Sequence, residues 1–372
     1  MSASEATDFL VIGGGVMGLS IGYGLATAGE TVRVLDEGDI AFRASRGNGG
    51  LVWVQGKGVG KPAYASWTIS AVKRWPEFAA RLLEETGIDV ELSQIGGLHI
   101  CLSEAELASR VKGMESLRAA LDYYPYEVLD RTELAKLCPL IGPEVVGGVF
   151  CPLDGHVSPL RLLRALVAAF RKAGGQLVVD APATQISHRH GLFTVKTKLG
   201  EFCATRIVLA SGLGNIGLAP QLGMQAHVEP IRGQMLVTER VQPFLRHPWH
   251  AIRQTREGVV QLGASKEEVG FDDGTSLDSL ATITRRAIRC FPLLAHVNAV
   301  RSWGALRPMT PDGYPLYQES RAYRGAFAVN CHSGITLASE HAGSLVDWLR
   351  GRMAPVAVSE FNEERFSVQT AQ

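Results

Sequence analysis

The first forty residues alternate between short apolar runs and a glycine-rich turn. Residues 9–12 (Phe-Leu-Val-Ile) are apolar and end at Gly13, a pattern typical of a buried parallel strand. A stretch of helical length then runs to about Ala28, and a second apolar run over 31–35 ends at Asp36. This order predicts a strand–helix–strand unit, which favours a parallel sheet with helices packed on it.

Hydrophobic periodicity predicts further helices and strands along the rest of the chain. We expect helices over 67–85, 104–121, 159–172, 277–290 and 335–349, and strands over 176–179, 235–238, 258–263 and 326–329. A hairpin is expected over 90–102, turning at two adjacent glycines. Ser158 is placed to cap the helix over 159–172. The apolar face of that helix is predicted to consist of Leu160, Leu163, Val167 and Phe170.

The composition excludes several classes of protein. The chain has 372 residues, 46% hydrophobic and 20% charged, which excludes disorder as the main state and suits two domains or one nucleotide-binding domain with insertions. Thirty-seven basic residues balance thirty-seven acidic ones, so nucleic acid is not expected as the main partner. The six cysteines form no CxxC motif, and no metal site is expected. Without a signal peptide or a long apolar segment, we expect no transmembrane helix and a cytoplasmic location.

The glycines at positions 13, 15 and 18 have the spacing of a dinucleotide-binding fingerprint. Gly13 permits a tight turn, Gly15 lets the backbone approach a pyrophosphate, and Gly18 lets helix and strand pack closely. The pyrophosphate would bind at the helix N-terminus, where N–H groups and the helix dipole favour negative charge. Asp36 is placed to accept a hydrogen bond from a ribose 2′-hydroxyl and disfavours NADP. The fingerprint alone does not distinguish FAD from NAD.

A second glycine-rich segment, residues 43–50 (Arg-Ala-Ser-Arg-Gly-Asn-Gly-Gly), follows Asp36. Its small residues allow the backbone to lie against a flat ring, and Ser45 and the two arginines can bind phosphate oxygens. A flexible surface loop is the alternative.

Together with these two segments, several later motifs resemble the glycine oxidase and D-amino-acid oxidase superfamily of flavoproteins. The motifs span residues 154–159 (DGHVSP), 207–212 (IVLASG), 230–234 (PIRGQ), 303–315 (WGALRPMTPDGYP), 332–337 (HSGITL) and 361–366 (FNEERF). The resemblance covers nearly the whole chain. It implies an α/β fold in which a Rossmann-type FAD-binding domain is interleaved with an α+β substrate domain built on an antiparallel sheet. The expected FAD-binding parts are 1–90, 148–227 and 301–372, and the expected substrate parts are 91–147 and 228–300.

Two segments resemble one branch of this superfamily, the B subunits of opine oxidases. They are residues 49–58 (GGLVWVQGKG) and 331–334 (CHSG). The resemblance implies oxidation of a secondary or N-substituted amino acid by hydride transfer from the α-carbon to flavin N5, followed by imine hydrolysis. It also implies a hetero-oligomer with a second flavoprotein or NAD-type subunit and a small iron–sulfur subunit, to which electrons pass.

Three alternatives stay open. The first is a free-standing glycine or D-amino-acid oxidase that uses oxygen. The second is the flavoprotein subunit of a D-hydroxyproline dehydrogenase. The third is a flavin-binding subunit without chemistry of its own.

The fingerprint and the resemblance together imply a set of FAD-binding residues. They are Gly13, Gly15, Val16, Met17, Gly18, Asp36, Glu37, Arg43, Ala44, Ser45, Asn48, Gly49, Gly50, Leu51, Ala210, Ser211, Gly212, Arg307, Ser333, Gly334, Ile335 and Thr336. Because residues 332–334 precede a predicted long helix, its N-terminal N–H groups are expected to stabilise the reduced, anionic flavin.

Arg307 and His332 are the expected catalytic residues. The resemblance places Arg307 where related oxidases hold a substrate carboxylate by a two-pronged contact, and an ion pair with Asp312 is the alternative. For His332 the alternative is a loop histidine with satisfied hydrogen bonds. Arg253 and Arg256 are candidates for the substrate's other charges, although a surface location is favoured for both.

Two positions depart from the pattern of the related monomeric sarcosine oxidases. Ala305 stands where those enzymes tether the flavin through a cysteine, so FAD is expected to be non-covalent. Gln261 stands where they hold a lysine that activates oxygen, and loss of this cation weakens the stabilisation of superoxide. This departure favours a dehydrogenase that passes electrons to a partner subunit.

Overall fold

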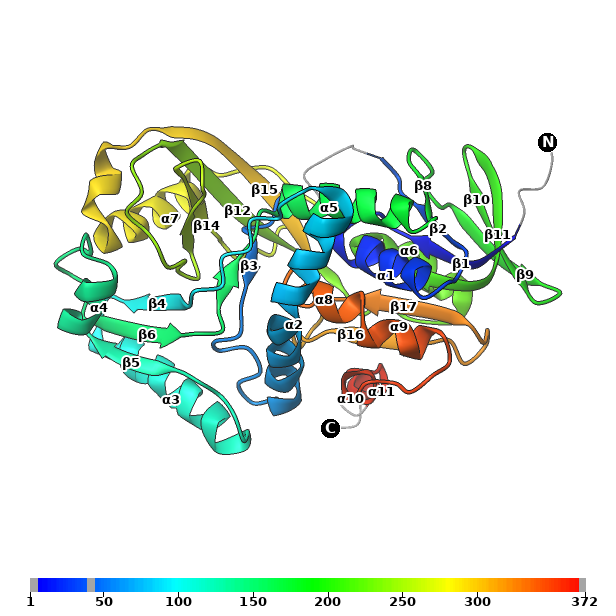
Figure 1. Cartoon of the computed structure of the whole chain (residues 1–372), viewed down its shortest axis with the longest axis horizontal. Helices are drawn as coiled ribbons and strands as arrows, with labels where there is room; N and C mark the ends of the chain where they lie inside the picture. The colour runs from blue at the N-terminus through cyan, green and yellow to red at the C-terminus, as the bar shows by residue number, and fades with distance from the viewer. Residues whose placement is uncertain (1–5, 39–43, 368–372) are drawn as a thin grey trace.

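The computed structural model describes residues 6–38 and 44–367 and contains a parallel sheet and separate antiparallel sheets (Figure 1). The predicted strand–helix–strand unit is confirmed as β1 (Thr7–Ile12), α1 (Val16–Thr27) and β2 (Val32–Leu35), with β1 and β2 paired in parallel. The α/β fold class is therefore confirmed.

The largest sheet extends on both sides of β1. Its order is β16 (Leu316–Glu319), β17 (Ala326–Asn330), β11 (Gly200–Leu209), β1, β2 and β8 (Gln176–Val178), and β9 (Gln185–Arg189) and β10 (Leu192–Thr197) form a hairpin beside β11. The five strands from β17 to β8 are parallel, so their carboxyl ends meet at one edge. Ligands of such sheets bind at this edge.

Helices cover one face of this sheet and bury its main core. α1 packs on α5 (Pro159–Lys172), and α2 (Pro62–Thr86), α8 (Ala338–His341) and α9 (Ser344–Leu349) complete the layer. Because strand side chains alternate, Phe9 and Val11 face this helical layer, whereas Leu10 and Ile12 face a second apolar cluster. The short helix α6 (Asn215–Leu218) follows β11, and the short helices α10 (Val356–Glu360) and α11 (Glu364–Ser367) lie near the C-terminus (Figure 1).

The other part of the molecule is built on antiparallel sheets. A four-stranded sheet has the order β13 (Ile252–Gln254), β14 (Val259–Gly263), β12 (Glu229–Arg240) and β15 (Ala299–Met309). A three-stranded sheet has the order β4 (Gly97–Cys101), β6 (Gly147–Cys151) and β5 (Glu127–Asp130), and β3 (Leu51–Val52) pairs with β7 (Gly155–His156). The helices α3 (Glu104–Ala120), α4 (Arg131–Leu137) and α7 (Leu277–Cys290) pack on these sheets.

The chain crosses between the two parts several times, and β15 runs from one toward the other (Figure 1). The predicted divisions after residues 147 and 300 fall inside β6 and β15. The division into domains itself stays a prediction.

Three local predictions are corrected by the structure. The hairpin over 90–102 does not form, because β4 pairs with β6 and Ser93 bridges to His156, so both partners are distant in sequence. The helix expected over 335–349 is two short helices, α8 and α9, separated at Gly343, a residue type that weakens helices.

The third correction concerns α5. Its bounds match the prediction, but the Ser158 hydroxyl makes no capping hydrogen bond and Leu160 is 56% exposed. The buried face of α5 instead follows Leu162, Leu166 and Phe170, because α1 and α2 pack on that side.

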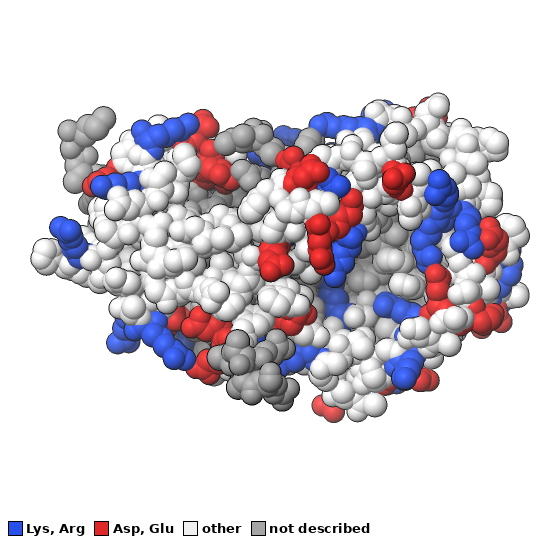
Figure 2. Space-filling model, turned by 180° about the vertical axis from the view of Figure 1, so that it is seen from behind, with Lys and Arg blue, Asp and Glu red and all other residues white. Residues whose placement is uncertain are grey.

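The described part of the chain contains no helix that is both long and apolar enough to span a membrane. Figure 2 shows basic and acidic side chains interspersed over one face of the molecule, in keeping with the formal net charge of zero.

Candidate functional site

A cavity of about 690 Å³ lies where the carboxyl edge of the parallel sheet meets the four-stranded sheet. Gly13 and Ala210, which follow β1 and β11, line one side, and Met235 and Ala305 line the other. Both parts of the molecule therefore contribute to one site, at the edge where the sheet topology predicts a ligand.

The fingerprint glycines have the contacts that their predicted roles require. Gly13 has a positive φ of 109°, which favours glycine. A Cβ on Gly18 would lie 1.9 Å from the Gly13 carbonyl oxygen, so α1 approaches β1 closely only because Gly18 has no side chain. Asp36 accepts hydrogen bonds from the N–H groups of Gly14 at 2.7 Å and Gly38 at 3.0 Å, and it lines the cavity.

The glycine-rich segment is fixed in place by contacts with other elements. The Ser45 hydroxyl accepts a hydrogen bond from the N–H of Val16 at 3.0 Å, which brings it to the N-terminus of α1. Trp303 of β15 donates its indole N–H to the Gly47 carbonyl at 3.1 Å. These contacts join the segment to both parts of the molecule, so the described residues 44–50 are not a free surface loop.

One face of the four-stranded sheet is directed at the cavity. The residues on this face are Gly233 and Met235 of β12, Arg253 of β13, Gln261 and Gly263 of β14, and Ala305 and Arg307 of β15. Their neighbours Leu236, Ile252 and Leu262 belong to an apolar cluster on the opposite face. The antiparallel register therefore separates a site face from a core face.

Arg307 is a half-buried cation without a carboxylate ion-pair partner among the described residues. Its guanidinium donates to the carbonyl oxygens of Ser265 at 2.9 Å and Arg232 at 3.5 Å. Asp312, the alternative partner considered from sequence, is instead bound by Arg365 at 2.7 Å. Since an arginine has five N–H donors, Arg307 retains donors for an anion in the cavity.

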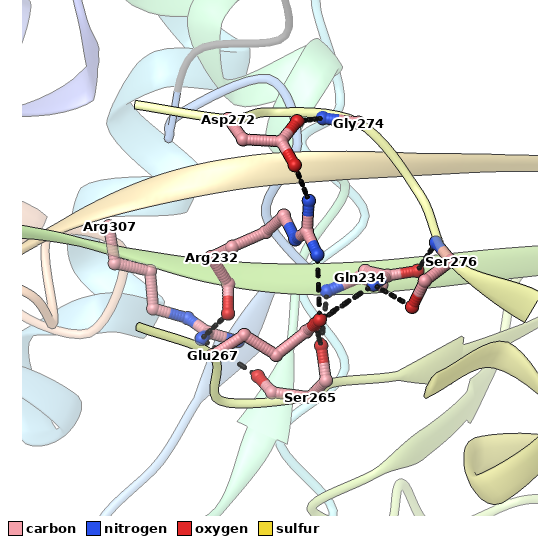
Figure 3. Close-up of polar contacts among 8 residues, drawn as sticks. All are labelled: Arg232, Gln234, Ser265, Glu267, Asp272, Gly274, Ser276 and Arg307. Carbon is pink, nitrogen blue, oxygen red and sulfur yellow. Dashed lines mark hydrogen bonds and ion pairs between the residues drawn. The ribbon is translucent and has the colours of Figure 1, made fainter. Parts of the chain in front are cut away.

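An ion-pair network holds the chain beside Arg307 (Figure 3). Arg232 bonds to Glu267 at 2.8 Å and to Asp272 at 2.6 Å. Gln234 donates to Glu267 at 2.9 Å. Burial raises the pKa of Glu267, but hydrogen bonds from Arg232, Ser265 and Gln234 outweigh this effect and lower it to about 2. Glu267 therefore stays ionised and forms its ion pair with Arg232 rather than with Arg307.

Arg253 is a second cation in the cavity, and it is buried. Its Nε donates to Gln261 Oε1 at 2.7 Å, its Nη1 lies 3.3 Å from His156 Nδ1, and burial lowers its pKa to about 10. No ion pair joins it to a carboxylate of the described chain. Arg256, by contrast, does not line the cavity: it is exposed and pairs with Asp89 at 3.0 Å.

The segment before α8 forms a turn rather than the start of a long helix. None of the described residues accepts a hydrogen bond from the N–H groups of Gly334, Ile335 or Thr336, and all three residues line the cavity. The ring of His332 is exposed into the cavity, where the surrounding protein and the charges of Lys57 and Arg307 lower its pKa to about 3. His332 is therefore neutral near pH 7.

Lys57 also lines the cavity, and its role was not predicted from sequence. Its ammonium group donates to the hydroxyls of Ser333 at 2.5 Å and Thr336 at 3.3 Å. Burial lowers the pKa of Lys57 to about 8. A lysine between two glycines, just after a short strand, is the sequence signal that points to this position.

Comparison with known proteins identifies the family. The model of the FAD dependent oxidoreductase family matches residues 8–348. The chain belongs to the FAD-dependent oxidoreductase family. The opine oxidase B subunit of Agrobacterium tumefaciens is 42% identical over 98% of this chain and 99% of its own, and that of Rhizobium meliloti is 38% identical over the same shares. The crystal structure of glycine oxidase from Geobacillus kaustophilus superposes with a TM-score of 0.88 at 25% identity, covering 94% of this chain and 96% of that one.

This FAD-dependent oxidoreductase acts on amino-acid-like CH–NH groups, and its cavity fits FAD. The fingerprint turn and the α1 N-terminus suit the pyrophosphate. The unaccepted N–H groups at 334–336 suit an electron-rich ring edge. When bound, FAD accepts the two electrons that leave the substrate.

Most of the predicted FAD-binding residues line this cavity. They are Gly13, Gly15, Val16, Met17, Asp36, Glu37, Ala44, Ser45, Asn48, Gly49, Leu51, Ala210, Ser211, Gly212, Arg307, Ser333, Gly334, Ile335 and Thr336. Gly18 and Gly50 lie behind them, packed against backbone carbonyls, and Arg43 lies outside the described residues. Which of these residues contact FAD stays a prediction.

Gly18→Ala is expected to reduce FAD binding, because the new methyl group must push α1 away from β1. Overpacking of this kind costs about 1–3 kcal/mol. The measurement is the ratio of flavin to protein absorbance in the purified variant, together with its thermal unfolding midpoint. Gly113→Ala, in α3, is the matched control, since the new Cβ would contact only Val59, at 3.4 Å. A normal flavin content in Gly18→Ala would contradict the role assigned to this glycine.

Proposed function

We propose that this FAD-dependent oxidoreductase oxidises a secondary amino acid that carries at least two carboxylates, as opines do. The observation that carries the proposal is that Arg253 and Arg307 line one cavity, Arg253 buried and Arg307 half-buried, without an ion pair to a described carboxylate. Burying an unpaired cation is costly, so a substrate with two anionic groups suits this site. The relatives named as opine oxidase B subunits support the same substrate class.

The proposed reaction removes two electrons from the substrate. The C–H bond at the α-carbon breaks, hydrogen and electron pair pass together to FAD, and the nitrogen lone pair forms a C=N bond. The nitrogen then loses its proton, and water hydrolyses the imine to an amine and a 2-oxo acid. Arg307 contributes by fixing one carboxylate, which orients the α-hydrogen, and a misplacement of about 1 Å can cost about a hundredfold in rate. Neutral His332 is proposed as a hydrogen-bonding residue facing the substrate.

The electrons are proposed to leave through a partner rather than through oxygen. The two similar proteins of Agrobacterium tumefaciens and Rhizobium meliloti are named as subunits, which supports a multi-subunit enzyme. We propose a second flavoprotein or NAD-type subunit and a small iron–sulfur subunit as partners. D-Hydroxyproline dehydrogenation and a glycine or D-amino-acid oxidase activity are the competing functions, but a substrate with one carboxylate leaves Arg253 without a counter-charge.

The expected result with wild-type protein is anaerobic bleaching of the flavin by octopine or nopaline, and slower bleaching by sarcosine, glycine or D-hydroxyproline. Arg307→Ala should slow bleaching by all of these substrates at least a hundredfold, equivalent to about 3 kcal/mol for a broken charged pair. Arg307→Lys should be impaired less, since it keeps the charge but loses the planar fork. Stopped-flow absorbance measures the rates, and the flavin content should be normal in both variants.

Arg253→Met is the matched variant that separates the two carboxylate contacts. It should weaken binding of octopine and nopaline but leave bleaching by sarcosine nearly unchanged. Equal losses with both kinds of substrate, or normal bleaching in Arg307→Ala, would show that the carboxylates are held elsewhere.

Oxygen is expected to reoxidise the reduced protein on the order of tenfold more slowly than an artificial dye, which corresponds to about 1.4 kcal/mol in barrier height. The reason is that Gln261, not a lysine, lines the cavity at this position, and its side chain is bound to Arg253. The measurement is turnover of the isolated chain with each acceptor at the same substrate concentration. Equal turnover with oxygen and dye would favour the free-standing oxidase instead.

The FAD is expected to be bound without a covalent link. Ala305 lines the cavity at the position where related enzymes carry a tethering cysteine, and its methyl group offers no nucleophile. Acid precipitation should therefore release all of the yellow colour into the supernatant, as measured by absorbance. Colour that stays with the precipitated protein would disprove this expectation.

A further inference from the structure

We propose that Lys57 is the cation that stabilises the negatively charged, reduced flavin at its pyrimidine end. The proposal rests on the expectation that residues 333–336 hold this end of FAD. It does not depend on which amino acid is the substrate.

The backbone that carries Lys57 is fixed by hydrogen bonds from several directions. The N–H groups of Val54 and Gln55 both donate to Asp154 Oδ1, at 2.5 Å and 3.3 Å. The N–H of Gly56 donates to the Tyr124 hydroxyl at 2.9 Å, and the N–H of Lys57 donates to the Val54 carbonyl at 3.0 Å. The backbone is therefore held in place before any ligand binds, and the hydrogen bonds of the ammonium group to Ser333 and Thr336 fix the charge, which is the condition for effective electrostatic stabilisation.

The hydrogen bonds of the ammonium group direct its charge to the segment before α8. Ser333 Oγ accepts from Lys57 and also from the Tyr64 hydroxyl, at 2.6 Å. Burial raises the pKa of Tyr64, so this phenol keeps its proton and remains a donor. With both of its lone pairs occupied, the Ser333 hydroxyl can only donate its own hydrogen to a further group. Lys57 and Ser333 therefore present an N–H donor and an O–H donor beside residues 334–336.

No ion pair within the described chain neutralises Lys57. The nearby Cys331 thiol is neutral, because burial raises its pKa to about 12. Burial also raises the pKa of Asp154 to about 7; its Oδ1 accepts from the N–H groups of Val54 and Gln55, and it forms no ion pair with Lys57. A cation in this position is available for an anionic ligand.

A long helix was expected to supply the positive potential at this end of the flavin, and the structure removes that source. α8 begins only at Ala338 and has four residues, so its dipole is far smaller than that of a long helix. Lys57 brings a full charge to the same segment instead. The three free N–H groups at 334–336 add hydrogen-bond donors but no net charge.

The test uses FAD-loaded protein, sulfite and a redox dye, without substrate or partner subunits. Lys57→Met and Lys57→Gln both remove the charge, and glutamine can still donate to Ser333. In both, the sulfite dissociation constant should rise about tenfold or more. The midpoint potential of the flavin should fall by at least about 30 mV, because about 30 mV corresponds to a tenfold change in the equilibrium constant of a two-electron couple. Lys57→Arg keeps the charge and should stay within about threefold of wild type.

Lys61→Met is the matched control. It removes a lysine four residues away whose ammonium pairs with Glu360 at 2.7 Å and does not line the cavity, and it should change neither quantity. Unchanged sulfite affinity and potential in Lys57→Gln would overturn the proposal and assign Lys57 a structural role. Shifts in Lys57→Arg as large as those in Lys57→Gln would do the same. Because opines are absent from the test, its failure is distinct from failure of the proposed substrate class.

Discussion

The ion pair between Arg232 and Glu267 is the interaction on which the candidate substrate site depends. Its backbone groups form a two-way bridge, with Arg232 N to Glu267 O at 2.9 Å and Glu267 N to Arg232 O at 3.0 Å. This bridge ties the chain after β14 to the edge of β12 and presents the Ser265 carbonyl to Arg307 (Figure 3). Removal of either partner would break this pair and leave Arg232 with Asp272 alone, or leave Glu267 with hydrogen bonds but without a cation. It would also release the carbonyl that orients the guanidinium of Arg307.

The same pair decides which arginine is free to bind an anion. Arg232 of β12 and Arg307 of β15 lie on adjacent paired strands, and Arg307 is opposite Ile231, the residue before Arg232. Glu267 and Asp272 nevertheless both bond to Arg232. Arg307 receives only carbonyl oxygens. Strand alternation explains the difference, because Arg307 shares the cavity face with Ala305.

The sequence predicts the parts of this site that are local in the chain. The fingerprint depends on the contact of Gly18 with Gly13, five residues away, and on Asp36 at the end of the next strand, so spacing alone reveals it. Lys57 could not be assigned in this way, because its partners Ser333 and Thr336 are 276 and 279 residues away. The long helix expected over 335–349 failed for a related reason. The hydrophobic pattern runs through Gly343, but its neighbour Ala342 packs with its carbonyl directly against Gly24 of α1, a contact that periodicity does not encode.

Arg253 and Arg256 show that a shift of three residues decides whether an arginine faces the cavity or the surface. Both lie in or just after β13 of the four-stranded sheet, and the sequence gives no reason to prefer either as a substrate-binding residue. Arg253 belongs to β13, where its pairing with Gln261 of β14 turns it toward the cavity. Arg256 follows the end of that strand and meets Asp89 at the surface.

The charges that line the cavity link the two proposals. Arg253, Arg307 and Lys57 are three cations that have no ion pair with a described carboxylate. In the proposed reaction, two substrate carboxylates offset the two arginines. The third cation, Lys57, then has Asp154 nearby but no ion-pair partner until the electrons reach FAD and the reduced ring becomes negative. Because the pKa of Lys57 is lowered to about 8, its charge is complete at lower pH and is lost as the pH rises through that value. The stabilisation that Lys57 provides should follow the same direction, so the flavin potential should fall more steeply above about pH 8 in wild-type protein than in Lys57→Met. The pKa of Asp154 lies near 7, so titration of that carboxylate precedes the change, whereas Cys331 and Tyr64 keep their protons and His332 stays neutral throughout this range.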